Sequence, residues 1–395
     1  MIKPAKRTEN ITYAIRDVVV EADKLKAKGK KILHLNIGNP NIFDFKTPRH
    51  MIDAVKKAMD ENRNGYAHSM GLDEGKEAIV RDASRKGIQT VKDDVIICSG
   101  VSEGIEMCFA ALLNPGENIL TPSPGYPLYT SMVHKFQGVL NQYKCIESDG
   151  WQPDIEDIRS RINEKTRGIV IINPNNPTGA LYGRKVLKEI IDLANEHDLV
   201  IFSDEIYDKI LFDGESHIST ASISKDIPIL TFNGLSKNYL APGWRIAWMM
   251  FSGPEREMGD YKEGISKFAR ARLSSNFPIQ YAIKPALEGP QDHIPEAVKK
   301  LEERRNLTFK RMNEIKGFRL TKPKGAFYAF PGFDLPVKDD KKFVMDLLRE
   351  KLILFVHGTG FGYEKPDHMR IVFLPDMETL SKAYDKLEEY VNKHF

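Results

Sequence analysis

A regular alternation of helical and strand patterns between residues 48 and 236 is the feature that most constrains the fold. Segments such as 49–61 (RHMIDAVKKAMDE) and 184–198 (RKVLKEIIDLANEHD) carry apolar residues at the spacing of an amphipathic helix. Apolar runs of about four to eight residues that alternate with such helices indicate a mainly parallel sheet covered on both faces. The sequence therefore predicts an α/β fold. The short, mostly apolar runs lie at 93–100, 166–173, 199–207 and 228–236, and a turn with a further strand is expected at 114–124.

The chain length predicts two domains, because 395 residues exceed the size of one ordinary hydrophobic core. After about residue 285 the alternation stops, and a long charged helix at 295–315 leads into short mixed segments. We expect a large domain over residues 47–285 and a smaller α+β domain over residues 286–395. Residues 1–46 are expected to form an N-terminal arm that joins the smaller domain.

Charge and hydropathy exclude several kinds of partner. The 58 Lys and Arg residues nearly balance the 55 Asp and Glu residues, so the net charge of +3 does not indicate a nucleic-acid partner. No apolar run approaches the roughly 20 residues that a membrane-spanning helix needs. The first residues lack the apolar centre of a signal peptide. We therefore expect a cytoplasmic protein with no membrane partner.

The three cysteines, Cys98, Cys108 and Cys145, form neither a CxxC pair nor a cluster with histidine. We expect them to be buried thiols, and we expect no metal site.

Two glycine-rich segments could be mistaken for nucleotide-binding motifs. GLDEGKE at 71–77 lacks the spacing of a P-loop, and HGTGFG at 357–362 does not match GxGxxG, so ordinary turns are expected at both.

Polar residues follow the apolar runs at the places where strands are expected to end. These segments read SGVSE at 99–103, NPNNPTG at 173–179, SDEIY at 203–207 and NGLSK at 233–237. The carboxyl ends of parallel strands meet at one edge of a sheet, where ligands bind. Lys237 stands out because lysine is rarely buried among apolar residues, and desolvation lowers the pKa of a lysine. An alternative is a loop lysine that reaches solvent, with Arg245 in a surface ion pair.

Four segments of the chain together resemble the fold-type I pyridoxal-phosphate enzymes, and specifically the class I and II aminotransferases. Within that family the chain resembles the alanine aminotransferases of bacteria and archaea. The resemblance implies a large domain with a mainly parallel seven-stranded sheet between helices, and a smaller α+β domain. The segments are GYAHSMGLDEGKEAI, NPNNPTG, SDEIYDKI and FNGLSKNYLAPGWR, with NIGNP and HMRIVFL near the two ends.

The resemblance implies pyridoxal 5'-phosphate as the cofactor and assigns residues to it. Lys237 would bind its aldehyde and move protons, and Asp204 would pair with its ring nitrogen. Tyr207 and Asn176 would donate to its phenolic oxygen, and Tyr126 would stack on its ring. Other interpretations remain for three of them: a helix N-cap for Asp204, a plain turn for Asn176 and a core position for Tyr126.

A phosphate site is implied as well. A helix is expected to begin at Val101 and Ser102, so free N–H groups there would face the anion, with Ser236 and Arg245 adding side-chain contacts. In the family a tyrosine equivalent to Tyr66 reaches this phosphate from the neighbouring subunit, which implies a homodimer. Many relatives carry a serine three residues before the lysine, where this chain has Gly234. One phosphate contact of the family is therefore expected to be missing or to be supplied by the backbone.

Arg370 resembles the arginine that binds the substrate α-carboxylate, although a strand arginine facing solvent is the alternative. Gly38 would let the chain approach that carboxylate closely, and Asn176 would touch both cofactor and substrate. The implied reaction is a ping-pong amino transfer between L-alanine and 2-oxoglutarate, because no second arginine can be placed for a β-carboxylate. An aspartate, aromatic or broad-specificity aminotransferase is the first alternative, and a pyridoxal-phosphate C–S β-lyase is the second.

Overall fold

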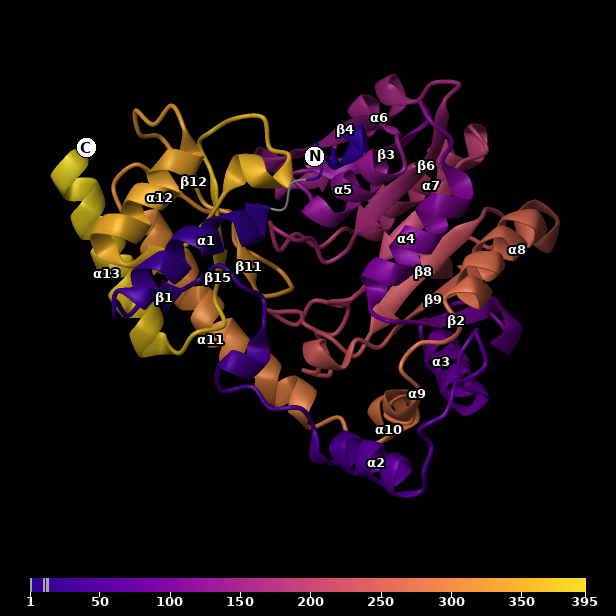
Figure 1. Ribbon diagram of the computed structural model, residues 1–395. Helices are drawn as coiled ribbons and strands as arrows, with labels where there is room; N and C mark the ends of the chain where they lie inside the picture. Colours follow the sequence, from indigo (N-terminus) through magenta and orange to yellow (C-terminus); the bar gives the residue numbers. More distant parts are fainter. Residues whose placement is uncertain (1, 10, 12–13) are drawn as a thin grey trace.

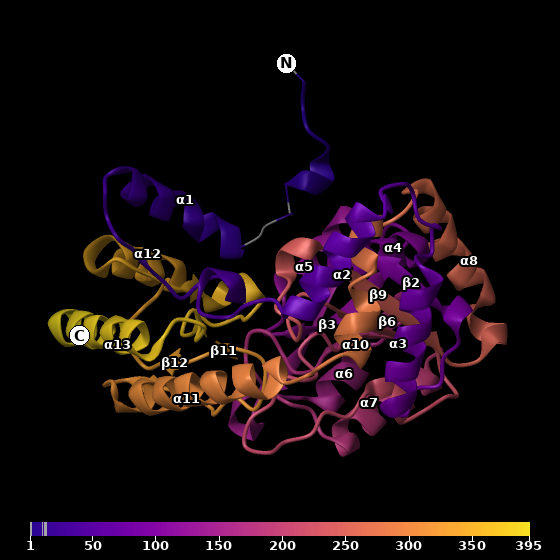
Figure 2. The ribbon, with the colours of Figure 1, turned by 90° about the horizontal axis from the view of Figure 1, so that it is seen from below.

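The computed structural model describes residues 2–9, 11 and 14–395. Residues 1, 10, 12 and 13 of the predicted arm lie outside the described residues. The described chain folds into two lobes that lie side by side, as Figures 1 and 2 show. The lobe on the right of Figure 1 contains the chain of the predicted large domain, and the lobe on the left contains the C-terminal helices. The domain boundaries at residues 46 and 285 stay predictions.

An eight-stranded sheet forms the centre of the larger lobe, in the order β2-β9-β8-β7-β6-β3-β4-β5. The five strands from β8 to β4 run parallel to one another, whereas β9 and β5 are antiparallel to the strands beside them. The α/β class and the mainly parallel sheet are thus confirmed. The bounds are β2 Val95–Cys98, β3 Asn118–Ser123, β4 Val139–Ile146, β5 Gln152–Pro153, β6 Thr166–Ile172, β7 Val200–Asp204, β8 Ile229–Gly234 and β9 Ala247–Ser252.

Successive residues of the central strands are buried on opposite faces of the sheet. On β6, Ile169 and Ile171 join one buried cluster, and Val170 and Ile172 join another. The sequences of these central strands are continuously apolar because helices cover both faces of the sheet. One face is covered by α4 (Val101–Leu112), α5 (Pro127–Lys135) and α8 (Glu255–Ala271). The other is covered by α2 (Arg49–Asp60), α3 (Asp73–Arg85), α6 (Ile155–Arg161), α7 (Arg184–Glu196) and α10 (Ile283–Glu288), with the short α9 (Phe277–Gln280) beside α2.

As far as the chain is described, the smaller lobe is α+β, with three small sheets packed among four helices. The N-terminal segment joins it, since β1 pairs in parallel with β13, Leu33 beside Ile353. The helices are α1 (Ala14–Ala27), α11 (His293–Glu314), α12 (Asp340–Lys351) and α13 (Met377–His394). The sheets pair β1 (Leu33–His34) with β13 (Ile353–Leu354), β10 (Phe318–Arg319) with β12 (Gly332–Phe333), and β15 (Met369–Val372) with both β11 (Tyr328–Ala329) and β14 (Val356–His357).

The sheet has eight strands rather than the seven expected, because the two-residue β5 adds an antiparallel edge. Two further strands were not anticipated from the sequence. β4 contains Asn141, Gln142 and Lys144 and is half exposed, so it lacks the apolar run of a central strand. β9 begins at Ala247, shortly after a 3-10 helix at Pro242–Trp244, so no turn signal stands directly before it in the sequence.

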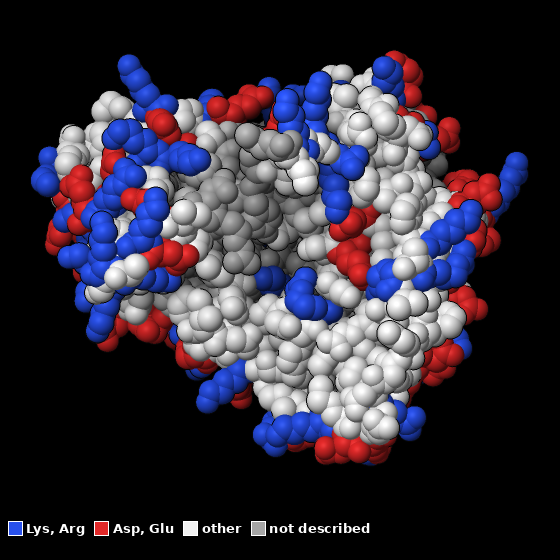
Figure 3. All heavy atoms as spheres, viewed as in Figure 1, with Lys and Arg blue, Asp and Glu red and all other residues white. Residues whose placement is uncertain are grey.

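Surface charge is mixed on the face shown in Figure 3, where Lys and Arg lie among Asp and Glu over both lobes. Within the described part of the chain, no helix combines the length and the apolar character that crossing a bilayer requires.

Candidate active site

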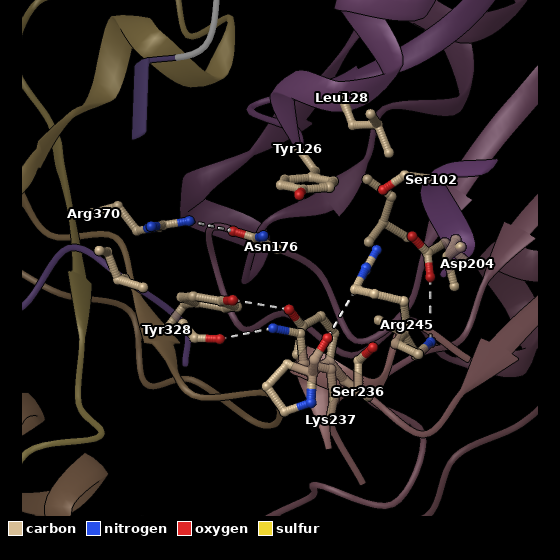
Figure 4. Close-up of a pocket in the computed structure, with 17 residues that line it drawn as sticks. Ser102, Tyr126, Leu128, Asn176, Asp204, Ser236, Lys237, Arg245, Tyr328 and Arg370 are labelled. Atoms are coloured by element: carbon tan, nitrogen blue, oxygen red, sulfur yellow. Dashed lines mark hydrogen bonds between the residues drawn. The ribbon is translucent and has the colours of Figure 1, made fainter. Parts of the chain in front are cut away.

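A pocket of about 980 Å³, including its open mouth, lies where the strand ends of the larger lobe face the smaller lobe (Figure 4). The sheet register explains its position. Asp204 at the end of β7 pairs with Ile172 on β6 and Phe232 on β8, so the segments that follow these strands emerge at one edge. The lining residues include Gly38, Val101, Ser102, Tyr126, Asn176, Asp204, Tyr207, Ser236, Lys237, Arg245 and Arg370.

Tyr66 is the one predicted site residue that does not line this pocket. Its side chain is 84% exposed in the single chain. The predicted contact of Tyr66 with a neighbouring subunit therefore stays a prediction.

Lys237 points into the pocket rather than to the outer surface. Its Nζ donates a hydrogen bond to the carbonyl oxygen of Gly38 at 2.8 Å and lies 5.3 Å from the ring centroid of Phe327. Burial, together with the positive charges of Arg370 and Arg245, lowers the pKa of Lys237 to about 7, although Asp204 opposes this shift. A large fraction of the amine is therefore neutral near pH 7, the form that attacks a carbonyl carbon.

Asp204 is a buried carboxylate held by two donors. Its Oδ2 accepts a hydrogen bond from the hydroxyl of Tyr129 at 2.9 Å, and its Oδ1 accepts one from the Ile206 N–H at 3.3 Å. Burial raises the pKa of Asp204 to about 6, against the opposing effect of these two bonds. The carboxylate thus caps a turn and also lines the pocket. A protonated ring nitrogen would supply the positive partner that a buried carboxylate needs.

The NPNNPTG turn is braced by Asn175, not by Asn176. Oδ1 of Asn175 accepts hydrogen bonds from the N–H of Thr178 at 3.2 Å and from its hydroxyl at 2.9 Å. Asn176 instead faces the pocket, where its Oδ1 accepts a hydrogen bond from Nη1 of Arg370 at 3.2 Å (Figure 4). The plain-turn interpretation considered for Asn176 therefore describes Asn175 instead.

Two positive elements converge at the start of α4. Arg245 lies so close to Gly100 that a Cβ there would come 2.1 Å from its Nη2. The free N–H groups of the first turn of α4 carry partial positive charge. They would repel the guanidinium of Arg245 unless an anion lay between the two. Val101, Ser102 and Ser236 line the same end of the pocket. The arrangement fits a phosphate group.

The structure accounts for Gly234, the departure from the family pattern. Gly234 pairs with Ala247 on β9, and a Cβ at this position would come 2.8 Å from the Ala247 Cα. A serine there would require β9 to move away. Gly234 is not among the lining residues of the pocket, so this contact to a phosphate is absent from β8.

Arg370 on β15 is 1% exposed, so the solvent-facing alternative is wrong. Its Nη2 donates to the carbonyl oxygen of Asn36, and its guanidinium lies 4.7 Å from the ring centroid of Tyr328. Gly38 is needed beside this group, because a Cβ at Gly38 would come 2.3 Å from the Tyr328 hydroxyl oxygen.

Sequence reasoning missed two residues of the site. Tyr328 lines the pocket (Figure 4), and its hydroxyl shares a 2.9 Å hydrogen bond with the hydroxyl of Tyr207. Burial raises the pKa of Tyr207 well above its ordinary value. Tyr129 supports Asp204 from α5. Tyr129 lies in the first turn of α5, directly after the extended Tyr126, and no local pattern in the sequence marks it as a partner of Asp204.

Comparison with known proteins agrees with this geometry. Residues 30–387 match the model of the family "Aminotransferase class I and II". The chain is 42% identical to the glutamate-pyruvate aminotransferase AlaA of Escherichia coli K12 over 99% of this chain and 98% of that protein. It is also 42% identical to an alanine aminotransferase of Mycobacterium tuberculosis H37Rv, covering 98% and 91%. A solved alanine aminotransferase from Pyrococcus furiosus superposes with a TM-score of 0.97 at 46% identity, covering 99% and 100%.

Proposed function

The chain belongs to the class I and II aminotransferases, and we propose that within this family it transfers the amino group between L-alanine and 2-oxoglutarate, giving pyruvate and L-glutamate. The observation that carries the proposal is the full-length similarity to relatives named for glutamate, pyruvate and alanine. Amino acids and 2-oxoacids are the substrates of this family.

The enzyme is an aminotransferase with pyridoxal 5'-phosphate as its cofactor. When bound, this cofactor supplies an aldehyde that takes up the amino group and a protonated ring that draws electrons from the reacting carbon. Lys237 would hold the aldehyde carbon and Asp204 the ring nitrogen. Asn176 and Tyr207 would donate to the phenolic oxygen, and Tyr126 would cover the ring. The phosphate group would lie among Val101, Ser102, Ser236 and Arg245.

Different side chains of the protein would bind the substrate, move its proton and exclude water. The guanidinium of Arg370, fixed by Asn176 and by the carbonyl oxygen of Asn36, would bind the α-carboxylate through two parallel hydrogen bonds. The α-carbon would then lie near Lys237, whose neutral amine would remove its proton. The smaller lobe contributes Arg370 and Tyr328 to the pocket, so its approach to the larger lobe would exclude water from the reacting atoms.

Substrate choice follows from the charges around the pocket. Among its described lining residues the cations are Lys237, Arg245 and Arg370, and each has a role in the arrangement above. The walls otherwise include apolar residues, which suit a small side chain such as the methyl group of alanine. The second carboxylate of 2-oxoglutarate has no cation of its own among these residues, which is a reason to expect a neighbouring subunit to complete the site. The aliphatic lining residues are Ile37, Val101, Leu128, Ile172, Ile206 and Pro242.

We further propose that the enzyme is a cytoplasmic homodimer in which Tyr66 reaches the phosphate of the neighbouring site. The exposed ring of Tyr66, in a segment that resembles the family's shared-site tyrosine, supports this proposal.

A panel of amino donors, with 2-oxoglutarate and pyruvate as alternative acceptors, tests the function. We expect the highest kcat/KM for L-alanine with 2-oxoglutarate and for L-glutamate with pyruvate, with ping-pong kinetics. If kcat/KM is higher for aspartate or for an aromatic amino acid than for alanine, that amino acid is the preferred donor and the alanine assignment is wrong. Release of pyruvate and ammonia from a sulfur amino acid without any acceptor would favour the C–S lyase instead.

A further inference from the structure

The glycine-rich segment 357–362, HGTGFG, joins the two lobes beside the pocket. The carbonyl oxygen of Phe361 accepts a hydrogen bond from the Gly125 N–H at 2.9 Å. The carbonyl oxygen of Gly362 accepts one from the Ser123 hydroxyl at 2.7 Å. Ser123 ends β3, and Gly125 directly precedes Tyr126. The segment therefore attaches the smaller lobe to the turn that carries the ring-covering tyrosine.

The glycines of this segment are explained by close packing rather than by anion binding. A Cβ at Gly360 would come 2.3 Å from the Cβ of Ala14 on α1. A Cβ at Gly358 would come 2.7 Å from the carbonyl oxygen of His368. The turn is also tied to α12, since Thr359 donates from both its N–H and its hydroxyl to the Asp340 carboxylate at 2.7 Å. The segment is thus held on several sides.

The ring of Phe361 contacts the guanidinium of Arg370. The Arg370 Cζ lies 4.7 Å from the ring centroid of Phe361, the same distance as from Tyr328. Phe361 is 1% exposed, so this contact is desolvated. A planar guanidinium is attracted to aromatic faces at such distances, most strongly where water is excluded.

We propose that Phe361 is a positioning residue for substrate binding, which holds the guanidinium plane of Arg370 in the orientation that accepts an α-carboxylate. Two parallel hydrogen bonds to a carboxylate require a fixed guanidinium plane, whereas a long arginine side chain otherwise samples many rotamers. Hydrogen bonds to Asn36 and Asn176 fix the edges of the group, and the two rings fix its plane. The inference rests on the proposed role of Arg370 in binding the substrate carboxylate.

Phe361→Leu tests the proposal, because it keeps an apolar side chain but removes the flat ring. The probe is propionate, a carboxylate without an amino or oxo group, titrated by calorimetry into protein loaded with pyridoxal phosphate. We expect the propionate Kd, and the KM values of all amino acids and oxoacids, to rise together by about ten-fold. We expect kcat to stay within about two-fold and the cofactor Kd to stay unchanged.

Phe330→Leu is the matched control, because Phe330 is equally buried and packs 6.1 Å from Phe361 and 5.0 Å from His368. Its propionate Kd should stay within about two-fold of the native value. Equal weakening in both variants would overturn the proposal, since general loosening of the aromatic cluster would then explain the effect. Phe361→Met is made in parallel and judged by the same comparison, in case the leucine variant does not fold.

Arg370→Lys separates this inference from the proposed function. If Arg370→Lys leaves propionate binding unchanged, the carboxylate role of Arg370 is wrong and the inference falls with it. If Arg370→Lys weakens propionate binding while Phe361→Leu does not, only the positioning role of Phe361 is overturned.

Discussion

The hydroxyl of Tyr129 donates a hydrogen bond to Oδ2 of Asp204 at 2.9 Å, and both side chains are buried. Burial raises the pKa of Asp204 to about 6, and this bond opposes the shift because it favours the ionised carboxylate. Tyr129→Phe should therefore raise the pKa of Asp204 further, by about one unit, and weaken cofactor binding at pH 7 by up to about ten-fold.

The pH profile of the cofactor Kd checks this prediction. The weakening should disappear toward pH 9, where Asp204 is ionised in both proteins. Tyr143→Phe is the control, because the buried Tyr143 hydroxyl donates to the Val170 carbonyl oxygen at 2.8 Å, away from the pocket lining. A Tyr129→Phe profile that is lowered equally at every pH would indicate a merely structural role.

The lowered pKa of Lys237 predicts how the cofactor-free protein reacts. Only the neutral amine attacks the cofactor's aldehyde, so the rate of cofactor attachment should rise with pH up to about 7 and then level off. An ordinary lysine analogue in solution should become faster up to about pH 10. Stopped-flow absorbance measures both rates, and a protein rate that rises without a break to pH 10 would contradict the assignment.

An ion pair between the buried Asp208 and the partly exposed Lys86 supports the turn that carries Tyr207. The Asp208 carboxylate is 2.7 Å from Nζ of Lys86, which also contacts Asp82 at 2.7 Å. Asp208→Asn should lower the free energy of unfolding by about 2 kcal/mol, because it leaves the partly buried charge of Lys86 with one partner fewer. Differential scanning calorimetry checks this against Asp192→Asn, an exposed pair with Lys188 whose loss should cost less than about 0.5 kcal/mol.

The effect of Asp208→Asn should depend on pH. Although burial acts to raise it, Lys86 holds the pKa of Asp208 at about 2, below the ordinary value of about 3.9 in an unfolded chain. The stabilisation is therefore complete above about pH 4 and is lost as the pH falls toward 2. The melting temperatures of native protein and variant should converge over that range, and a constant difference would count against the ion pair.

Shared sites can be tested by mixing two defective variants. Tyr66→Ala and Lys237→Ala, dissociated together and reassociated, should form mixed dimers with one intact site each, about a quarter of all sites. The mixture should then exceed the mean activity of the two parents. Activity equal to that mean would contradict the predicted reach of Tyr66 into the neighbouring subunit.

The sequence predicted the strand-end part of the pocket well, for a physical reason. Polar residues that follow parallel strands are brought to one edge by the sheet itself, so Asn176, Asp204 and Lys237 could be placed together without knowledge of tertiary contacts. The apolar runs likewise revealed the central strands, because burial on both faces removes their polar residues.

The parts of the site and fold that the sequence did not predict depend on packing between segments far apart in the sequence. Tyr129 and Tyr328 read as ordinary core tyrosines until α5 and β11 are placed against the strand ends. The contact of Phe361 with Arg370 joins a turn to a neighbouring strand, which no local pattern encodes. β4 was missed because a half-exposed strand carries polar residues.

Reduction with sodium borohydride followed by peptide mass mapping tests the central claim most directly. Protein loaded with pyridoxal phosphate, reduced and digested, should carry the cofactor's mass on the peptide that contains Lys237, and Lys237→Ala should carry none there and lose the visible absorption. Attachment at another lysine, or an unmodified Lys237 peptide from protein that is fully active, would contradict the account.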